Sequence, residues 1–221
     1  MYKNFKIFTD LLSDELKKHL PSYVSHKKMM PAHITTDVKQ SYDKNKVKES
    51  AVLILFFVND DNISTVIIKR PEYDGVHSGQ IAFPGGKREK YDRTIIDTAI
   101  REAKEEVGIM PDDVKVIGTL SQIYVPPSMY IIHPIVSFCD NKPEFIADIN
   151  EVSDISIISL SDLLNDKSKS VIPIYKQGKY VFDAPAYIIN GYEIWGATAM
   201  IISELIDIIY ISKLSELVCK K

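Results

Sequence analysis

The stretch "GGKREKYDRTIIDTAIREAKEEVGI", residues 85–109, places a double glycine before a dense group of charged side chains. It predicts a tight loop followed by a helix over residues 94–107. Asp92 and Thr94 are both candidates for the N-cap, Asp97 has the spacing of a loose capping box with Thr94, and the next glycine suits the C-terminus. One side of this helix is apolar, as a helix packed on a core requires: Ile96, Ala99 or Ile100, Ala103 and Val107.

Three carboxylates share one face of this expected helix. Glu102, Glu105 and Glu106 stand at i, i+3 and i+4, about one turn apart. Arg101, four residues before Glu105, neutralises part of their mutual repulsion, and a hard divalent cation such as Mg²⁺ or Mn²⁺ would neutralise more. For "EAKEE" alone the simpler interpretation is a solvated acidic face. The double glycine favours a binding site, because glycine lets backbone approach a ligand or metal closely.

The same stretch resembles the Nudix box, the signature of hydrolases that cleave a nucleoside diphosphate linked to another group. The family pattern reads Gly, five residues, Glu, seven residues, then Arg-Glu-apolar-any-Glu-Glu-any-Gly-apolar. The segment "REAKEEVGI", residues 101–109, matches throughout, with a small residue, Ala103, at the apolar position. Upstream, Gly86 matches, but Asp92 replaces Glu and eight residues separate it from Arg101. The role of Asp92 is therefore left open.

With Asp92 and the extra residue, the box of this chain resembles the box of the coenzyme A pyrophosphatase subfamily, which also carries an Asp and one extra residue. Upstream, "IIKRPEYDGVHSGQIAFPGG", residues 67–86, resembles that subfamily's second signature, and "IYVPPSMYIIHPIVSF" and "WGATAMIISELI" resemble it downstream. The likeness extends over about residues 28 to 210. It implies a metal-dependent hydrolase, using Mg²⁺ or Mn²⁺, that cleaves coenzyme A or its derivatives to 3′,5′-ADP and 4′-phosphopantetheine or its acyl form.

The resemblance also implies roles for individual residues. Glu102, Glu105 and Glu106 would bind metal, the backbone carbonyl of Gly86 would add a ligand, and Arg101 would orient one of the glutamates through a salt bridge. In the family a further Glu from a later loop often serves as ligand or base. Glu151 is our candidate because it precedes an expected strand and short helix; an ordinary loop carboxylate is an equally good interpretation.

Candidate substrate residues lie outside the box. Lys69 and Arg70 end an expected strand and are placed to contact substrate phosphates, although Lys69 also fits a solvated side chain. His77 is a candidate for contact with the substrate or for a base, while a loop histidine is more often structural. Tyr124 and Phe83 are candidates for stacking on an adenine; core packing is the preferred interpretation for Phe83.

The order of expected helices and strands along the chain predicts one α/β (α+β) domain with a mixed sheet between helices, because strands and helices alternate irregularly. The Nudix resemblance implies the same α/β/α sandwich. We expect an amphipathic helix and an extended arm over residues 1–48, packed on a Nudix hydrolase domain over 49–221. The expected elements are helices at 5–20, 159–165 and 196–214, an extended arm at 21–48, and strands at 51–58, 64–70, 114–124, 130–138, 152–158, 171–175, 179–183 and 186–190.

The composition of the chain limits the kinds of partner that we expect it to bind. The chain has 221 residues and a net charge of −3, so no overall basic field favours nucleic acid. Its most apolar stretch, "AMIISELIDIIYI", is short and contains Glu204 and Asp207, so we expect no membrane span. Cys139 and Cys219 fit no metal spacing and suggest reduced thiols in a cytoplasmic protein. The expected partner is a small nucleotide resembling coenzyme A; a homodimer is possible.

Two other functions compete with this one. The same chemistry on another nucleotide, such as a nucleoside triphosphate, ADP-ribose or a dinucleotide, would use the same box. A catalytically silent Nudix domain would serve as a nucleotide-binding regulator. The complete set of box glutamates, Glu102, Glu105 and Glu106, and the lack of an attached DNA-binding motif both weigh against the regulator.

Overall fold

The computed structural model describes residues 2–32, 47–72, 77–126 and 128–218. Its main sheet has eight strands, five of which follow the order β3-β2-β1-β7-β5. Of the other three, β4 pairs with β1, β8 pairs with β2, and β6 pairs with β7. The β1–β7 pair is parallel and the other pairs are antiparallel, so the sheet is mixed. The strands are β1 (Lys48–Asn59), β2 (Asn62–Lys69), β3 (Ile81–Ala82), β4 (Gly85–Lys87), β5 (Lys115–Thr119), β6 (Ile123–Val125), β7 (Tyr130–Phe138) and β8 (Asp154–Ser159).

Strand β1 is the centre of the molecule because both of its faces are apolar. Ile54 and Phe56 point into one core, and Leu53, Leu55 and Phe57 point into the other. All five side chains are fully buried. The continuous apolar run thus forms a strand covered on both sides, and a tight turn joins it to β2 in a hairpin.

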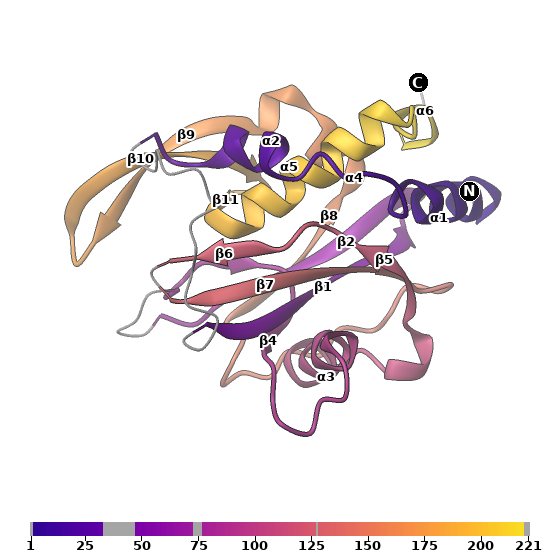
Figure 1. Ribbon diagram of the computed structural model, residues 1–221, viewed down its shortest axis with the longest axis horizontal. Coiled ribbons are helices and arrows are strands. Elements are labelled where there is room, and N and C mark those ends of the chain that lie inside the picture. The colour runs from indigo at the N-terminus through magenta and orange to yellow at the C-terminus, as the bar shows by residue number, and fades with distance from the viewer. Residues whose placement is uncertain (1, 33–46, 73–76, 127, 219–221) are drawn as a thin grey trace.

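Helices cover the two faces (Figure 1). Helix α3 (Ile95–Val107) lies on one side and α1 (Tyr2–Glu15), α4 (Leu160–Leu164) and α5 (Gly196–Ile211) lie on the other. This confirms the α+β architecture with a mixed sheet between helices. The shorter turns are α2 (Tyr23–His26), η1 (Lys27–Met29), η2 (Pro111–Asp113), η3 (Asp166–Ser168) and α6 (Ser215–Val218). No helix among the described residues is long and apolar enough to span a membrane.

A second sheet of three strands projects from this body (Figure 1). Its order is β11-β10-β9, with β9 (Lys169–Lys176), β10 (Lys179–Ile189) and β11 (Tyr192–Trp195). The sequence predicts two short strands at 179–183 and 186–190, whereas β10 is continuous. The pairing with β9 is regular from Asp183 to Ala186, where the break was expected, and the shift in register lies earlier, between Tyr180 and Phe182.

Two other expectations about local structure are wrong. Within the expected arm, residues 23–29 form short helical turns, because their side chains and backbone are bonded to α5; residues 33–46 lie outside the described residues. The strand expected over 114–124 is interrupted between β5 and β6. In that gap the backbone N–H of Ser121 donates a hydrogen bond to the Glu204 carboxylate, at 3.0 Å, and not to a neighbouring strand.

Candidate active site

Two glycines bring strand β4 close to its neighbours. Gly85 pairs with Val52 of β1 and has a φ of 156°, and a Cβ there would lie 2.2 Å from the carbonyl oxygen of Ala51. A Cβ on Gly86 would lie 2.4 Å from a carboxylate oxygen of Glu102 on α3. The sheet backbone therefore requires glycine at position 85, whereas a side chain at position 86 would displace the Glu102 carboxylate.

Helix α3 begins and ends where the sequence predicts. Thr94 is the N-cap and forms a capping box with Asp97, and Gly108 closes the helix with a φ of 76°. Ala99, Ala103 and Val107 are buried against the sheet. Glu106 is buried in the same face, and Glu102 lies beside it, so both carboxylates meet β4 at Gly85 and Gly86.

The carboxylates of Glu102, Glu106 and Glu151 each offer an oxygen atom that lies within 4.8 Å of the others. Glu102 and Glu106 are one turn apart on α3, whereas Glu151 comes from the turn before β8. That turn is fastened to the end of α3, since the N–H groups of Ile146 and Asp148 donate to the carbonyls of Val107 and Glu106, at 3.0 and 3.1 Å. We refer to Glu102, Glu106 and Glu151 as the glutamate trio.

The trio carries more negative charge than its surroundings balance. Burial raises the pKa of Glu106 to about 7, with Glu102 and Glu151 adding repulsion, while Arg70 and the N–H of Gly85 oppose the rise. The N–H of Gly85 donates to Glu106 at 2.7 Å, and Arg70 stands 4.0 Å away from its other oxygen. Burial also raises the pKa of Glu102. A buried carboxylate that resists ionisation suits a bound cation.

Arg101 connects the helix to the preceding loop. Its guanidinium donates to both oxygens of Asp92, at 3.0 and 2.9 Å, and to Glu102 and Glu105, each at 2.8 Å. It also donates to the carbonyl of Lys87 at 3.0 Å. Glu105 is half exposed and, bound to Arg101, lies outside the trio.

Asp92, whose role the sequence leaves open, is a buried partner of Arg101. It also accepts hydrogen bonds from the hydroxyl of Thr98 and the N–H of Glu89, both at 2.9 Å. The hydrogen bonds from Arg101 come first among the causes that hold the pKa of Asp92 well below its usual range. Sequence reasoning missed Thr98. Its position three residues before Arg101, on the same side of the helix, is the signal that points to this contact.

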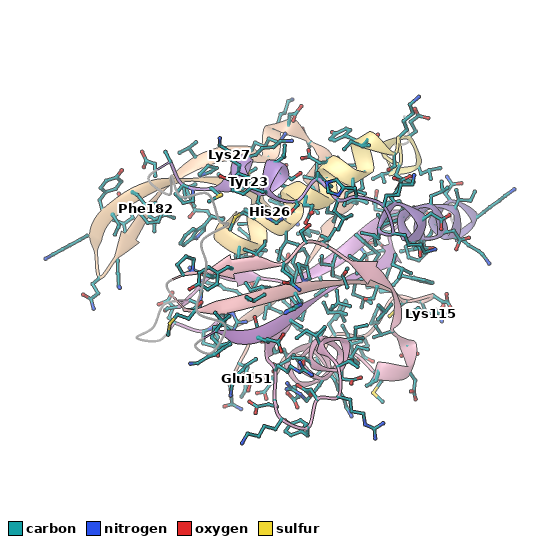
Figure 2. All side chains as sticks on the ribbon, viewed as in Figure 1. Tyr23, His26, Lys27, Lys115, Glu151 and Phe182 are labelled. Carbon is teal, nitrogen blue, oxygen red and sulfur yellow. The ribbon has the colours of Figure 1, made fainter. Side chains whose placement is uncertain are left out.

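A cleft of about 1320 Å³ adjoins the trio at Gly85–Lys87. Lys69, Arg70, His77 and Tyr124, the predicted substrate residues, all line it. Nδ1 of His77 lies 3.0 Å from the side-chain oxygen of Gln80, and Arg70 donates to the carbonyl of Gly85 at 2.9 Å. Figure 2 places Glu151 on the α3 side of the sheet.

Comparisons with known proteins agree with this geometry. The model of the NUDIX domain matches residues 47–177. The "Uncharacterized Nudix hydrolase NudL" proteins of Yersinia pestis (strain Pestoides F) and Yersinia pseudotuberculosis serotype O:1b (strain IP 31758) are each 33% identical over 161 residues, which cover 72% of this chain and 78% of the relative.

Among solved structures, a MutT/nudix family protein from Enterococcus faecalis has the same fold. Its TM-score is 0.51 at 14% identity, and the match covers 88% of this chain and 71% of that one. The matched family region contains β4, the whole of α3 and Glu151. The chain therefore belongs to the Nudix family and is a Nudix hydrolase, an enzyme that cleaves a pyrophosphate linkage.

Proposed function

We propose that this hydrolase cleaves coenzyme A or its derivatives, releasing 3′,5′-ADP and 4′-phosphopantetheine or its acyl form. The observation that carries the chemistry is the glutamate trio at the edge of a cleft that also contains Lys69 and Arg70. Carboxylates supply a cation site, and the basic side chains supply partners for phosphate. Both are needed before water can approach a phosphorus atom shielded by anionic oxygens.

Nudix hydrolases generally use divalent metal ions, and the trio fits such an ion. Three carboxylate oxygens within 4.8 Å of one another form a hard oxygen site, and one of them belongs to the 2% exposed Glu106. We propose Mg²⁺ or Mn²⁺, held by Glu102, Glu106 and the carbonyl of Gly86, with the neighbouring Glu105 as a further ligand. A bound divalent cation screens the phosphate oxygens and makes water more acidic.

The chain's own residues position this reaction. Arg101 holds Glu102 and Glu105 by one nitrogen, at 2.8 Å each, and so fixes two carboxylates on the helix. Glu151 is the exposed member of the trio, and we propose it as general base or additional ligand.

On the substrate side, we propose that Lys69 and Arg70 contact the phosphates and that His77 and Tyr124 contact the rest of the nucleotide. All four side chains line the cleft. Lys69 and Arg70 follow directly on one another at the end of β2, so two positive charges are available beside β4.

Coenzyme A as substrate rests on the signature over residues 67–86 and on the variant box. Its 3′-phosphate needs a cation, which Lys69 or Arg70 would provide, so dephospho-coenzyme A should be the poorer substrate. The test compares kcat/KM for coenzyme A, dephospho-coenzyme A, ADP-ribose, diadenosine polyphosphates and nucleoside triphosphates, with products identified by mass. If one of the last three exceeds coenzyme A by about tenfold, roughly 1.4 kcal/mol, the enzyme acts on that nucleotide instead.

Three broader proposals come from the sequence. We propose that residues 1–48 are an N-terminal extension, beginning with helix α1, that packs on a hydrolase domain over 49–221, that the protein works in the cytoplasm, and that it forms a homodimer. Cys139 is buried and unpaired; Cys219 lies outside the described residues. Sedimentation of the full chain tests the dimer: a single species at about 25.1 kDa would exclude it.

A further inference from the structure

Part of the cleft is built by residues outside the matched family region. Tyr23, His26 and Met30 of the N-terminal segment line it, together with Phe182 of β10 and Trp195 at the end of β11. Phe182 and Trp195 stand edge to face with ring centroids 6.3 Å apart. Figure 2 shows Tyr23 and His26 beside α5 and Phe182 on the second sheet, far from Glu151. We call this part of the cleft the aromatic end.

A buried carboxylate of α5 fixes the N-terminal segment at the aromatic end. Glu204 is fully buried and accepts hydrogen bonds from the N–H of Ser22 at 2.9 Å and from the N–H and hydroxyl of Ser121 at 3.0 and 2.6 Å. Nε2 of His26 lies 3.1 Å from it. Burial opposes ionisation of Glu204, but the hydrogen bonds from His26 and Ser121 outweigh it and lower its pKa.

These contacts determine which ring nitrogen of His26 is available. An ionised Glu204 can only accept hydrogen bonds, so Nε2 must carry the proton that bonds to it. Nδ1 has no hydrogen-bond partner among the described residues. His26 lines the cleft, and its side chain is 8% exposed.

The charge of the lining differs between the two ends of the cleft. Lys69, Arg70 and Lys87 line the end next to β4, where a nucleotide's phosphates would be balanced. The lining residues from the N-terminal segment and α5 include no Lys or Arg: Tyr23, His26, Met30, Pro31, Gly196, Ala197, Thr198, Met200 and Ile201. The second sheet adds one positive and one negative side chain to the lining, Lys176 and Glu193, whose charges sum to zero. This aromatic end suits a largely apolar, uncharged group with a few polar atoms rather than a second phosphate.

We propose that the aromatic end is a second subsite, in which Tyr23 contacts the amide-bearing arm of the substrate and Nδ1 of His26 hydrogen-bonds one of its amides. This inference rests on the proposed function, since it assigns the pantetheine half of coenzyme A to this end and the adenosine bisphosphate half to the other. Glu204 acts as a positioning residue, because it touches His26 and not the substrate.

Calorimetric titration of the full-length protein with the two product halves, 4′-phosphopantetheine and 3′,5′-ADP, tests the subsite. Tyr23→Ala and His26→Phe should each weaken 4′-phosphopantetheine binding by about tenfold, the effect of losing one good contact, and leave 3′,5′-ADP binding unchanged. Lys28→Met is the matched control: it removes an ion pair with Asp207, at 2.6 Å, in the same segment but does not line the cleft. It should change neither affinity.

The outcomes separate the subsite from the proposed function. If the wild type cleaves coenzyme A but both variants bind 4′-phosphopantetheine normally, or lose both halves equally, the subsite is wrong and the function stands. If the wild type neither binds 4′-phosphopantetheine nor cleaves coenzyme A, both proposals fail. Should His26→Phe not fold, Tyr23→Ala decides alone, because Tyr23 is only partly buried and lies outside the Glu204 hydrogen bonds.

Discussion

Gly86 is in contact with Glu102 and leaves no space for a side chain, since a Cβ would lie 2.4 Å from the carboxylate. Its φ is not positive, so alanine meets no backbone strain, and the only cost of Gly86→Ala is displacement of Glu102. We predict that this variant stays folded but binds Mn²⁺ at least tenfold more weakly, measured by calorimetry. Unchanged Mn²⁺ affinity would mean that Glu102 takes no part in the metal site.

Glu106 titrates near neutrality in the metal-free protein, with a pKa of about 7 that burial raises from 4.5. Because the folded state holds this proton more tightly than the unfolded state, ionising Glu106 destabilises the fold as pH rises from about 4.5 to 7. A bound cation favours the ionised form, so metal binding should expel the proton.

Calorimetry in buffers of different ionisation enthalpy measures that proton. We predict that Mn²⁺ binding at pH 6 releases close to one proton from this group and that the release falls toward zero by about pH 8.5. Glu106→Gln should abolish it, whereas Glu144→Gln, on an exposed loop, should leave it intact. A pH-independent release that persists in Glu106→Gln would contradict the assignment.

At the scale of elements, the pairing of Arg101 with Asp92 joins α3 to the loop after β4. Asp92→Asn keeps the shape of the side chain but removes its negative charge. That carboxylate accepts hydrogen bonds from Nε and Nη2 of Arg101, at 3.0 and 2.9 Å. We predict a loss of roughly 2 kcal/mol in the free energy of unfolding at pH 7, as for other partly buried charge pairs with one partner removed. Urea denaturation measures it, with the exposed Asp112→Asn as control. Equal stabilities would leave the loop without this anchor.

The elements that the sequence predicts well are those whose signals are local. The capping box at Thr94, the C-cap at Gly108 and the apolar run of β1 specify their own structure, and the structure has them where expected. The segments that differ owe their form to distant partners. Ser25 and His26 bond to α5 across more than 170 positions, and no local pattern announces that.

Some contacts of the candidate site also follow from local sequence spacing, whereas others depend on distant partners. The spacing of Glu102 and Glu106 on one face of α3 is a property of helices, and the sequence alone gives it. The closeness of Glu151 depends on hydrogen bonds between the loop before β8 and the end of α3, and the pairing of Asp92 with Arg101 depends on how the loop folds back. Both are tertiary contacts, so their geometry appears only in the structure.

At the scale of the molecule, Glu204 ties together three parts of the chain: the N-terminal segment, the link between β5 and β6, and α5. Its folded pKa is lowered from 4.5, so ionised Glu204 contributes stability above about pH 4.5, and that contribution is lost as pH falls below it. Glu204→Gln should cost roughly 3 kcal/mol of unfolding free energy at pH 7. The difference from wild type should shrink as the pH falls below about 4.5, and a constant difference would rule out this titration.

We have proposed that a divalent ion held by Glu102 and Glu106 enables this chain to hydrolyse a pyrophosphate linkage. The most direct measurement is coenzyme A turnover, with products identified by mass, in protein stripped with EDTA and then supplied with Mg²⁺ or Mn²⁺. We expect no detectable 3′,5′-ADP in EDTA and full recovery of turnover on adding either ion. Turnover that continues undiminished in EDTA would contradict it.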